Sequence, residues 1–277
     1  EFLREQGLAG AEKKAGRIAA EGVSFAKVSE DMHTGVVVEV NAETDFVAKN
    51  AKFQAYVDQV CDQALTTSAT DIDAFLAEKW NLDETRTVAE QLSEEISIIG
   101  ENMHIRRFHK LVENEGLVSA YIHAGGRIGV ILQVKSDVVN DAVAEMAKNI
   151  AMQIAALNPK YTTRAEVDQE YLAHETAILT EAAKNEKPNA PEKVLNGMVQ
   201  GRLNKELKEI CLVDQTYVRA EDGKQTVQQY VDSVAKAQGA KISLVTFVRY
   251  ETGEGLEKKS EDFAAEVAAQ QAAAKKN

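Results

Sequence analysis

The sequence is poor in several features that would assign it to a common class of protein. Its 277 residues include two cysteines, three prolines and one tryptophan, and no apolar run approaches the length that crosses a bilayer. Two cysteines cannot build a disulfide framework. Cys61 and Cys211 both lie among apolar residues, so we expect small buried hydrophobic residues in a reducing, cytoplasmic compartment, with a Cys61–Cys211 disulfide as the alternative.

The chain also has no excess of basic residues. Its 32 Lys and Arg stand against 44 Asp and Glu, which gives a formal net charge of −12. Binding of nucleic acid without sequence preference requires clustered Lys and Arg that displace counterions, so this balance argues against a direct nucleic-acid partner. A hydrophobic content of 44% allows a substantial core, in one large or two smaller domains. A protein partner or a metal is the more expected ligand.

The patterns of catalytic and cofactor sites are also missing. None of the five histidines has metal-ligand spacing with another ligand; they lie at positions 33, 104, 109, 123 and 174. There is no serine nucleophile elbow, no Cys-His signature and no glycine-rich phosphate loop, since the glycines at 125–129 are typical of a hairpin. We therefore expect a protein without catalytic residues, metal or cofactor, built to bind another protein.

One stretch that is present lies at a junction between two strongly patterned segments. Residues 35–41 contain four valines and predict a strand buried on both faces. Three- and four-residue steps predict an amphipathic helix with the apolar stripe Phe53, Tyr56, Val57, Val60, Cys61, Ala64 and Leu65. Between them lies the acidic and aromatic turn Glu43-Thr44-Asp45-Phe46-Val47-Ala48-Lys49-Asn50.

This turn has two interpretations. In the first, Thr44 or Asp45 caps the helix, and Phe46, seven residues before the first aromatic residue of the stripe, extends its buried face. In the second, Lys49 and Asn50 interrupt the stripe, and Phe46 projects into solvent beside Asp45 as an anchor for a partner. The pattern alone favours the first interpretation.

The sequence repeats itself at a constant offset of 94 residues without a gap. The matched positions are Glu21-Gly22-Val23, Ala26, Val28, Gly35-Val36-Val37-Val38 and Val40 against Glu115-Gly116-Leu117, Ala120, Ile122, Gly129-Val130-Ile131-Leu132 and Val134. Each copy is predicted to begin as a β-hairpin, and the second has the glycine-containing tip His123-Ala124-Gly125-Gly126-Arg127. A helix follows each hairpin, the second with the stripe Val139, Val143, Met146, Ile150, Ile154 and Leu157.

Each copy is predicted to close with a third strand, at 103–108 in the first and 242–250 in the second. The first copy also carries a helical segment with Ile72, Phe75, Leu76 and Trp80, and another opened by a Thr87-x-x-Glu90 capping box. A helix from Thr226 to Ala237 precedes the last strand. Two β-β-α-β units predict an α+β fold, with a core N-subdomain at 22–112 and a core C-subdomain at 113–159 and 215–252.

An insertion at 160–214 separates the helix and the last strand of the second copy. It carries two apolar series, Val167, Tyr171, His174 and Ile178 before Pro188 and Pro191, then Leu195, Met198, Leu203, Leu207 and Ile210. These series predict an antiparallel helical hairpin, a coiled coil that projects from the body. At the two ends we expect a helix remnant and linker at 1–21 and a C-terminal helical module at 253–277 that contains Phe263 and Val267.

Five motifs, spread over most of the chain, carry a family resemblance. They are the stretch 41–50 followed by Phe53-Gln54-Ala55-Tyr56-Val57, Lys13-Lys14-Ala15-Gly16-Arg17-Ile18-Ala19-Ala20-Glu21-Gly22, Ile99-Gly100-Glu101-Asn102-Met103-His104-Ile105-Arg106-Arg107, His123-Ala124-Gly125-Gly126-Arg127-Ile128-Gly129-Val130, and Gly253-Glu254-Gly255-Leu256-Glu257-Lys258. In this order they resemble the bacterial elongation factor Ts family. The resemblance implies a guanine nucleotide exchange factor of elongation factor Tu, without catalytic chemistry of its own.

The resemblance also implies which residues contact the partner. Residues matching Asp45 and Phe46, flanked by Thr44 and Val47, enter the partner GTPase near its magnesium and nucleotide site. The second hairpin touches another domain of that GTPase, and the C-terminal helix adds contacts; the matching residues are His123, Gly125, Gly126 and Arg127 in the hairpin and Phe263 and Val267 in the helix. We expect an assembly with elongation factor Tu, and neither nucleic acid nor a membrane as a partner.

Two alternatives from other classes stay open. An acidic scaffold would bind its partner through the helical hairpin, with hot spots there instead of at Phe46. A hydrolase would use Asp45 and Glu43 as a carboxylate pair, although no pocket-forming glycines or partnering base appear nearby. The family begins with a three-helix domain, of which residues 1–7 are expected to represent the last helix, and the start at Glu1 instead of Met suggests that upstream sequence was removed.

Overall fold

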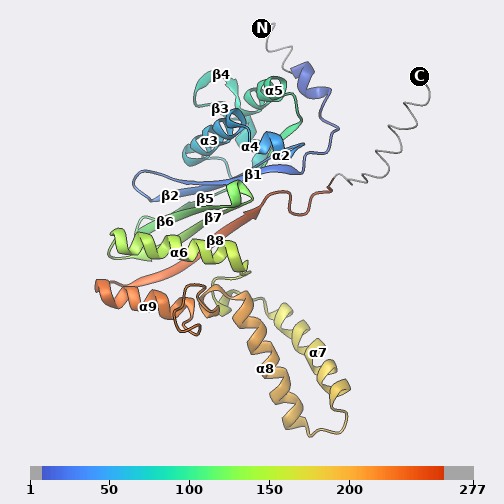
Figure 1. Cartoon of the computed structure of the whole chain (residues 1–277), viewed down its shortest axis with the longest axis vertical. Helices are drawn as coiled ribbons and strands as arrows, with labels where there is room; N and C mark the ends of the chain where they lie inside the picture. The colour runs from blue at the N-terminus through green and yellow to red at the C-terminus, as the bar shows by residue number, and fades with distance from the viewer. Residues whose placement is uncertain (1–7, 259–277) are drawn as a thin grey trace, which may run out of the picture.

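The computed structural model describes residues 8–258 as four stacked layers with a helical arm. One antiparallel sheet has the order β1-β2-β5 and a second has the order β6-β7-β8. Figure 1 shows the two sheets face to face, helices α3, α4 and α5 above the first, and helices α6 and α9 below the second. The predicted α+β class is confirmed. Within residues 8–258 we find no helix with the length and apolar character that a bilayer crossing requires.

The first sheet consists of β1 (Glu21–Val28), β2 (Thr34–Ala42) and β5 (Met103–Val112). Its central strand β2 is buried along eight of its nine residues, as the valine run predicts. The helices above it are α2 (Asp45–Ala48), α3 (Ala51–Thr66), α4 (Ile72–Ala77) and α5 (Val88–Ile99). The predicted stripe of α3 is confirmed, since Phe53, Tyr56 and Val60 are buried in the core beneath it.

One prediction for this half is wrong. Trp80 does not continue the helix that carries Phe75, because α4 ends at Ala77 and the chain then forms a small hairpin of β3 (Lys79–Trp80) and β4 (Asp83–Thr87). Trp80 nevertheless fills the core, where its ring lies 6.1 Å from that of Tyr56. Apolar periodicity identified a buried residue but placed it in the wrong element. The capping box of α5 is present as predicted, with Thr87 as the N-cap residue.

The second sheet consists of β6 (Gly116–His123), β7 (Ile128–Ser136) and β8 (Ile242–Glu251). Helix α6 (Asp141–Leu157), capped by Asn140, and helix α9 (Val227–Gln238), which opens with the predicted capping box at Thr226, cover its outer face. Val139 was predicted as part of the α6 stripe, but it precedes the helix and is 46% exposed. Cys61 and Cys211 are both buried free thiols, and burial raises the pKa of Cys211 to about 11.

The registers of the two sheets are related by a shift of 94 residues. Gly22 pairs with Asn41 in the first sheet and Gly116 pairs with Lys135 in the second. The irregularity in each central strand also lies at matching positions, between Glu39 and Val40 and between Gln133 and Val134. The two hairpins therefore share a backbone pattern as well as a sequence pattern.

Matching residues of the two hairpins also form the contact between the sheets. The buried core between them is Ala26, Val37, Leu111, Val118 and Ile131. Gly35 of β2 lies against the side chain of Val118, and Gly129 of β7 lies against the backbone oxygen of Ser24. The tip of the first hairpin reaches across as well, because the Met32 carbonyl oxygen accepts a hydrogen bond of 2.7 Å from the N–H of Val118. The sheets approach closely where each contributes a glycine.

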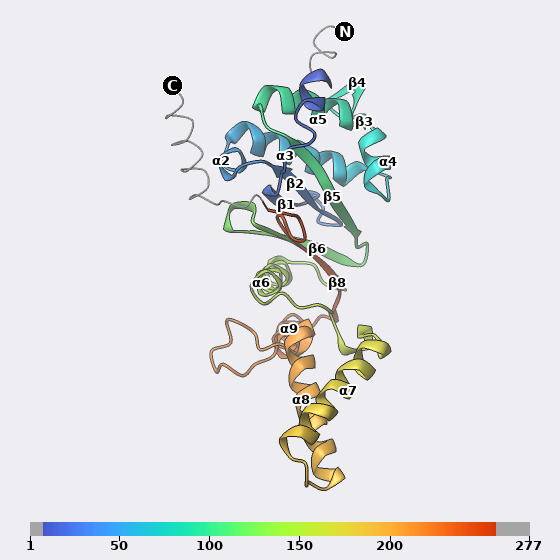
Figure 2. The ribbon, with the colours of Figure 1, turned by 90° about the vertical axis from the view of Figure 1, so that its right-hand side faces the viewer.

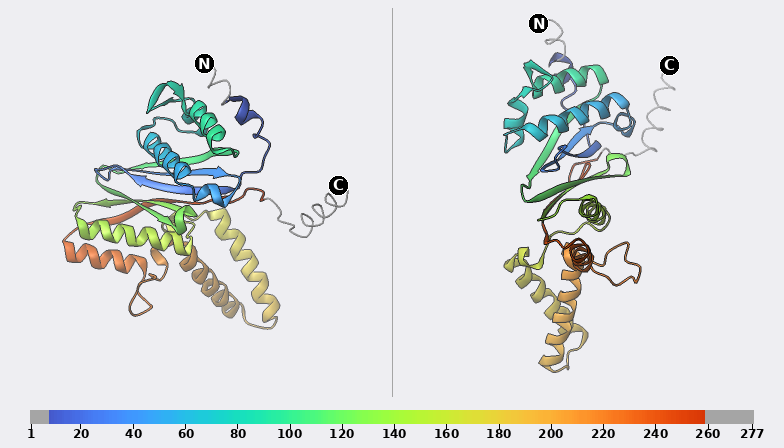
Figure 3. Two further views of the ribbon diagram at one scale, coloured as in Figure 1. Left: turned by 45° about the horizontal axis from the view of Figure 1, so that its top comes forward. Right: turned by 90° about the vertical axis from the view of Figure 1, so that its left-hand side faces the viewer.

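The insertion forms the expected antiparallel pair of helices, α7 (Gln169–Glu186) and α8 (Glu192–Ile210). The pair extends away from the sheets in each view (Figures 1, 2 and 3). The predicted contact face is wrong in detail, because His174 and Ile178 are exposed whereas Ala183 and Val199 are the fully buried residues of the two helices. Small and polar side chains form part of the contact between the two helices. The predicted apolar series therefore lies on a neighbouring face of α7 and not on the contact face.

The close contact between the sheets gives a stability prediction. An added Cβ at Gly129 would lie 2.7 Å from the Ser24 oxygen and 3.0 Å from Val37 Cγ2, so Gly129→Ala should lower the free energy of unfolding by about 1–3 kcal/mol. Gly197→Ala on α8 is the matched control, because nothing lies within 4 Å of its Cβ position and alanine favours a helix by up to about 1 kcal/mol. Urea unfolding of both variants measures the difference, and equal stabilities would contradict close packing.

Candidate functional site

The junction after β2 forms two consecutive helices, each with its own cap. Thr44 is the N-cap of α2, and its Oγ1 accepts a hydrogen bond of 3.3 Å from the N–H of Val47. Asn50 is the N-cap of α3, and its Oδ1 accepts a bond of 2.8 Å from the N–H of Lys52. The polar residues that interrupt the apolar stripe therefore end one helix and begin the next.

Phe46 lies on the outer side of α2, with 81% of its surface exposed. The inner side of this helix carries Ala48, which is buried, and Val47, which is half-buried against the core of the first half. The cap predicted at Thr44 is confirmed, whereas the burial of Phe46 predicted with it is wrong. A large apolar ring held in water on a capped helix is available to a partner.

Asp45 is exposed beside Phe46 and pairs with Lys49, whose ammonium donates a hydrogen bond of 2.7 Å to the carboxylate. This hydrogen bond is the largest cause that lowers the pKa of Asp45, so the group is anionic at neutral pH. Glu43 does not join it as a carboxylate pair, because Glu43 Oε1 accepts a bond of 2.6 Å from the N–H of Asn102. The geometry thus gives no support to acid–base chemistry by these two residues.

The tip of the second hairpin is a short turn, Ala124–Gly126, between β6 and β7. His123 is exposed, and the side chain of Arg127 is 67% exposed and lies 3.8 Å from the Glu251 carboxylate. Gly126 is buried with φ +103°, and a Cβ there would lie 2.8 Å from Val23, so this glycine serves the contact with the first sheet. Of the predicted tip residues, Gly126 is therefore the one that solvent does not reach.

The two predicted regions lie at the same end of the paired sheets. Both α2 and the turn Ala124–Gly126 contact β1, as Figure 3 allows the reader to follow. The segment after β8 reaches the same end, because the position of a Cβ on Gly253 lies 2.2 Å from the carbonyl oxygen of Ala20. Phe263 and Val267, which were predicted to add contacts, lie outside the described residues. Among residues 8–258, no group of three or more His, Cys, Asp or Glu side chains could hold a metal ion.

Comparison with known proteins identifies the family. The model of the family described as elongation factor TS matches residues 43–254, a range that includes α2 and both hairpin strands of the second sheet. The chain belongs to the elongation factor Ts family. It is 48% identical over 270 residues to elongation factor Ts of Clostridioides difficile (strain 630), an alignment that covers 98% of this chain and 87% of that relative.

Elongation factor Ts proteins of other clostridia are similar to the chain to nearly the same extent. That of Clostridium botulinum (strain Eklund 17B / Type B) is 47% identical over 98% of this chain and 87% of its own length. That of Clostridium perfringens (strain SM101 / Type A) is 46% identical over 97% of this chain and 86% of its own length. Membership in the elongation factor Ts family assigns the chain to the elongation step of protein biosynthesis.

Glu101 contacts the candidate site of this elongation factor Ts family member, although sequence analysis did not single it out. Its Oε2 accepts hydrogen bonds of 3.1 Å from the N–H of Glu43 and 3.0 Å from the N–H of Thr44. Its Oε1 accepts a bond of 2.7 Å from the hydroxyl of Thr44. Glu101 belongs to one of the motifs that resemble the family, and this was the one signal that could have marked it.

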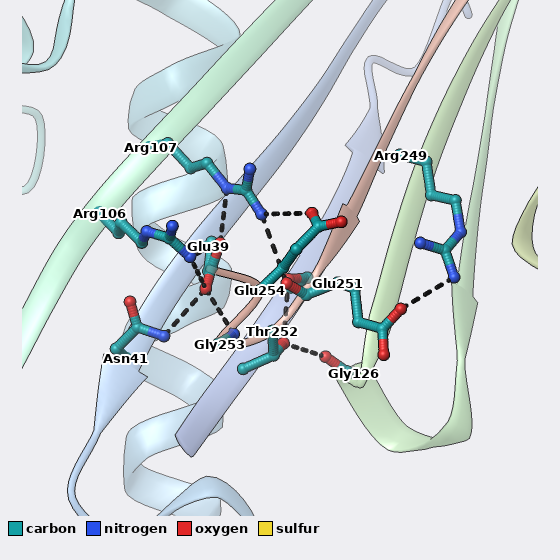
Figure 4. A network of polar contacts seen from close by, with 11 residues as sticks. Glu39, Asn41, Arg106, Arg107, Gly126, Arg249, Glu251, Thr252, Gly253 and Glu254 are labelled. Atoms are coloured by element: carbon teal, nitrogen blue, oxygen red, sulfur yellow. Dashed lines mark hydrogen bonds and ion pairs between the residues drawn. The ribbon is translucent and has the colours of Figure 1, made fainter. Parts of the chain in front are cut away.

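A second polar cluster, centred on the fully buried carboxylate of Glu39, joins the two halves (Figure 4). Arg107 Nε donates a bond of 2.6 Å to one oxygen, and the N–H of Gly253 donates a bond of 2.8 Å to the other. Asn41 and Arg106 add bonds of 3.0 and 3.1 Å. Arg107 also lies 4.0 Å from the centre of the Tyr250 ring. The cluster ties the segment after β8 to the first sheet.

The donors around Glu39 hold it in the ionised form. Burial alone would raise the pKa of this carboxyl, but the N–H of Gly253, the amide of Asn41 and the charge of Arg107 outweigh burial and lower the pKa below its ordinary value. Every oxygen is satisfied by groups of the chain itself. The cluster therefore has the character of a structural ion pair and not of a reactive carboxylate.

Replacement of the carboxylate tests this assignment. Glu39→Gln presents an N–H₂ group to donors that need an acceptor, and it should lower the free energy of unfolding by about 1–3 kcal/mol near neutral pH. A lowered pKa means that the carboxylate stabilises the fold above its ordinary pKa of 4.5 and loses this contribution as the pH falls through the lowered value. The difference in the free energy of unfolding between the native chain and Glu39→Gln should therefore become smaller as the pH is lowered.

Urea unfolding across a pH series measures that difference. Glu30→Gln is the matched control, because Glu30 is exposed at the turn between β1 and β2, and its replacement should leave the free energy of unfolding unchanged within about 0.5 kcal/mol. A Glu39→Gln difference that stays constant from neutral to acid pH would rule out an ionised Glu39 as its source.

Proposed function

We propose that the chain binds elongation factor Tu and promotes release of GDP by disturbing its magnesium and phosphate site, so that GTP can bind. The exchange factor supplies no catalytic residue; the chemistry of GTP belongs to the partner. The observation that carries the proposal is Phe46, an exposed aromatic ring on a capped helix beside the anionic Asp45, in a chain of the elongation factor Ts family. Aromatic side chains, phenylalanine included, are enriched in protein–protein interfaces.

The proposed mechanism is differential binding. An exchange factor must bind the nucleotide-free GTPase more tightly than the magnesium-GDP form, and a preference of roughly ten-thousand-fold corresponds to about 5.5 kcal/mol. An interface on the order of 2,000 Å² supplies affinity for both forms, whereas only groups that compete with magnesium and phosphate supply the difference. Phe46 would separate partner helices and disturb the magnesium site indirectly. Asp45 would bring negative charge toward the groups that hold the phosphates.

The second hairpin is proposed to contact another domain of the partner through His123 and Arg127. Both side chains are solvent-accessible at the end of the sheets that carries α2, so one partner could engage both regions at once. Gly125 and Gly126 would then shape the turn, and Thr44 and Val47 would fix α2. We retain the C-terminal residues Phe263 and Val267 in the proposal on the strength of the family resemblance.

The proposal includes a division of the chain into structural units. We propose a remnant of an N-terminal helical domain and a linker at 1–21, a core N-subdomain at 22–112 that carries α2, and a core C-subdomain at 113–159 and 215–252 that carries the second hairpin. The helical hairpin at 160–214 and a C-terminal module at 253–277 complete it. In this arrangement each core subdomain contributes one contact region.

The first functional prediction concerns Phe46 and Asp45. Phe46→Ala should slow stimulated GDP release from elongation factor Tu by roughly ten- to a hundredfold, because the ring is proposed to be a hot spot. Its cost in unfolding free energy should stay below about 0.5 kcal/mol, because the ring is 81% exposed in the free chain. Asp45→Ala should also slow release while leaving thermal unfolding unchanged. Release of labelled GDP, measured beside thermal unfolding, decides between binding and folding effects.

Ile178→Ala is the matched control, because Ile178 is an apolar side chain on the helical hairpin that is 48% exposed. It should leave GDP release unchanged. A larger effect at Ile178 than at Phe46 would favour a scaffold that binds through its hairpin.

The second functional prediction follows from reciprocity. If the chain lowers the affinity of elongation factor Tu for magnesium-GDP by some factor, magnesium-GDP must lower the affinity of that partner for the chain by the same factor. The complex should be tight without nucleotide and should dissociate when GDP and Mg²⁺ are added together. Replacement of both Asp45 and Phe46 by alanine should shrink this coupling and leave the remaining affinity largely in place.

Calorimetric titration of the partner, with and without saturating magnesium-GDP, measures the coupling for the native chain and for the double variant. Equal affinity of the native chain for the two partner states would exclude exchange activity by this mechanism.

A further inference from the structure

Helix α2 cannot hold its own conformation. It has four residues, whereas isolated helices shorter than roughly 12–15 residues are marginal in water. Its apolar contacts with the core are those of the buried Ala48 and the half-buried Val47, and at its last residue the carbonyl oxygen of Ala48 accepts a bond of 3.1 Å from Gln54 Nε2. The direction in which Phe46 points must therefore be fixed from outside the helix, by groups that hold its first turn.

We propose that Glu101 is the residue that positions α2, and with it Asp45 and Phe46, for the partner; the inference rests on the proposed function. One carboxylate oxygen accepts the N–H groups of Glu43 and Thr44, and the other accepts the hydroxyl of Thr44. These donors are the last residues before α2 begins. Bonds to a charged acceptor are about twice as strong as bonds between neutral groups.

The bond to the Thr44 hydroxyl also orients the helix cap. A threonine hydroxyl has one proton and two lone pairs, and here the proton is directed to Glu101. The lone pairs of Thr44 Oγ1 are then free to accept the N–H of Val47, which is the capping bond of α2. Without Glu101 the hydroxyl can rotate, and the cap loses its fixed acceptor.

The contact is reciprocal, because the two segments exchange side-chain acceptors. While Glu101 accepts from the backbone of Glu43, the side chain of Glu43 accepts a bond of 2.6 Å from the N–H of Asn102 and lies 3.4 Å from Arg17 Nη1. Asn102 in turn donates a bond of 2.7 Å to the carbonyl oxygen of Arg17. The start of α2 is thus held between the segment after α5 and the segment before β1.

The fold places Glu101 at this point through Gly100. Helix α5 ends there because Gly100 adopts a left-handed conformation with φ +88°. The chain turns at once, and the next residue faces the junction after β2. In this proposal Glu101 is a positioning residue that acts through the conformation of α2.

Two substitutions at Glu101 separate its role from a general effect on folding. Glu101→Ala removes all three acceptor contacts and should speed amide hydrogen exchange at residues 43–48 roughly tenfold or more, with other regions unchanged. Glu101→Gln keeps an oxygen for the two backbone N–H groups and should stay within about threefold of the native chain. Glu84→Ala, which removes an exposed carboxylate of the same half on β4, is the matched control and should change nothing.

The functional readout uses elongation factor Tu and labelled GDP. Glu101→Ala should lower stimulated GDP release roughly ten- to a hundredfold, Glu101→Gln should largely rescue it, and the effect of Glu101→Ala should vanish when Phe46→Ala is already present. Additive effects of Glu101→Ala and Phe46→Ala, or unchanged amide exchange at residues 43–48 in Glu101→Ala, would overturn the inference. If the native chain fails to stimulate release while Glu101→Ala still loosens residues 43–48, the proposed function fails and the structural role of Glu101 stands.

Discussion

The close approach of the two sheets is the constraint on which the other features of the fold depend. Gly35 and Gly129 occupy matching positions in the two hairpins, and each leaves room for the opposite sheet. Because the sheets meet face to face, their central strands β2 and β7 are buried on both faces, and the helices pack on the outer faces of the sheets. The helical arm is then left to extend from the outer layer without support from the sheets.

The same packing brings both predicted contact regions to one end of the paired sheets. The start of β1 lies there, with α2 on one side and the turn Ala124–Gly126 on the other. Two carboxylates hold this end together by different means. Buried Glu39 fixes the segment after β8 to the first sheet, and Glu101 fixes the backbone before α2. Each accepts hydrogen bonds from backbone N–H groups of a connecting segment and so holds that segment in a defined position.

Sequence patterns predicted the elements whose signal is local. The valine run gave the buried strand β2, and caps marked the helix ends at Thr87, Thr226 and Gly239. The patterns failed for Trp80, which is buried as predicted but lies in a strand and not in the predicted helix. They also failed in the helical hairpin, where small and polar residues form part of the contact between the two helices. The exposure of Phe46 could be predicted only if the polar residues that follow it were recognised as the cap of a second helix. Glu101 could not be assigned from spacing, because Thr44, its partner, lies 57 positions away.

The two halves differ most in the connection between the central strand and the following helix. Eight residues, 43–50, join β2 to α3, whereas four residues, 137–140, join β7 to α6, and an asparagine caps the helix in both cases. The difference equals the four residues of α2. The candidate site thus lies on a short helix that the corresponding junction at 137–140 lacks. Of the two corresponding junctions, one therefore presents an exposed ring, while the other connects its strand to its helix without an additional turn.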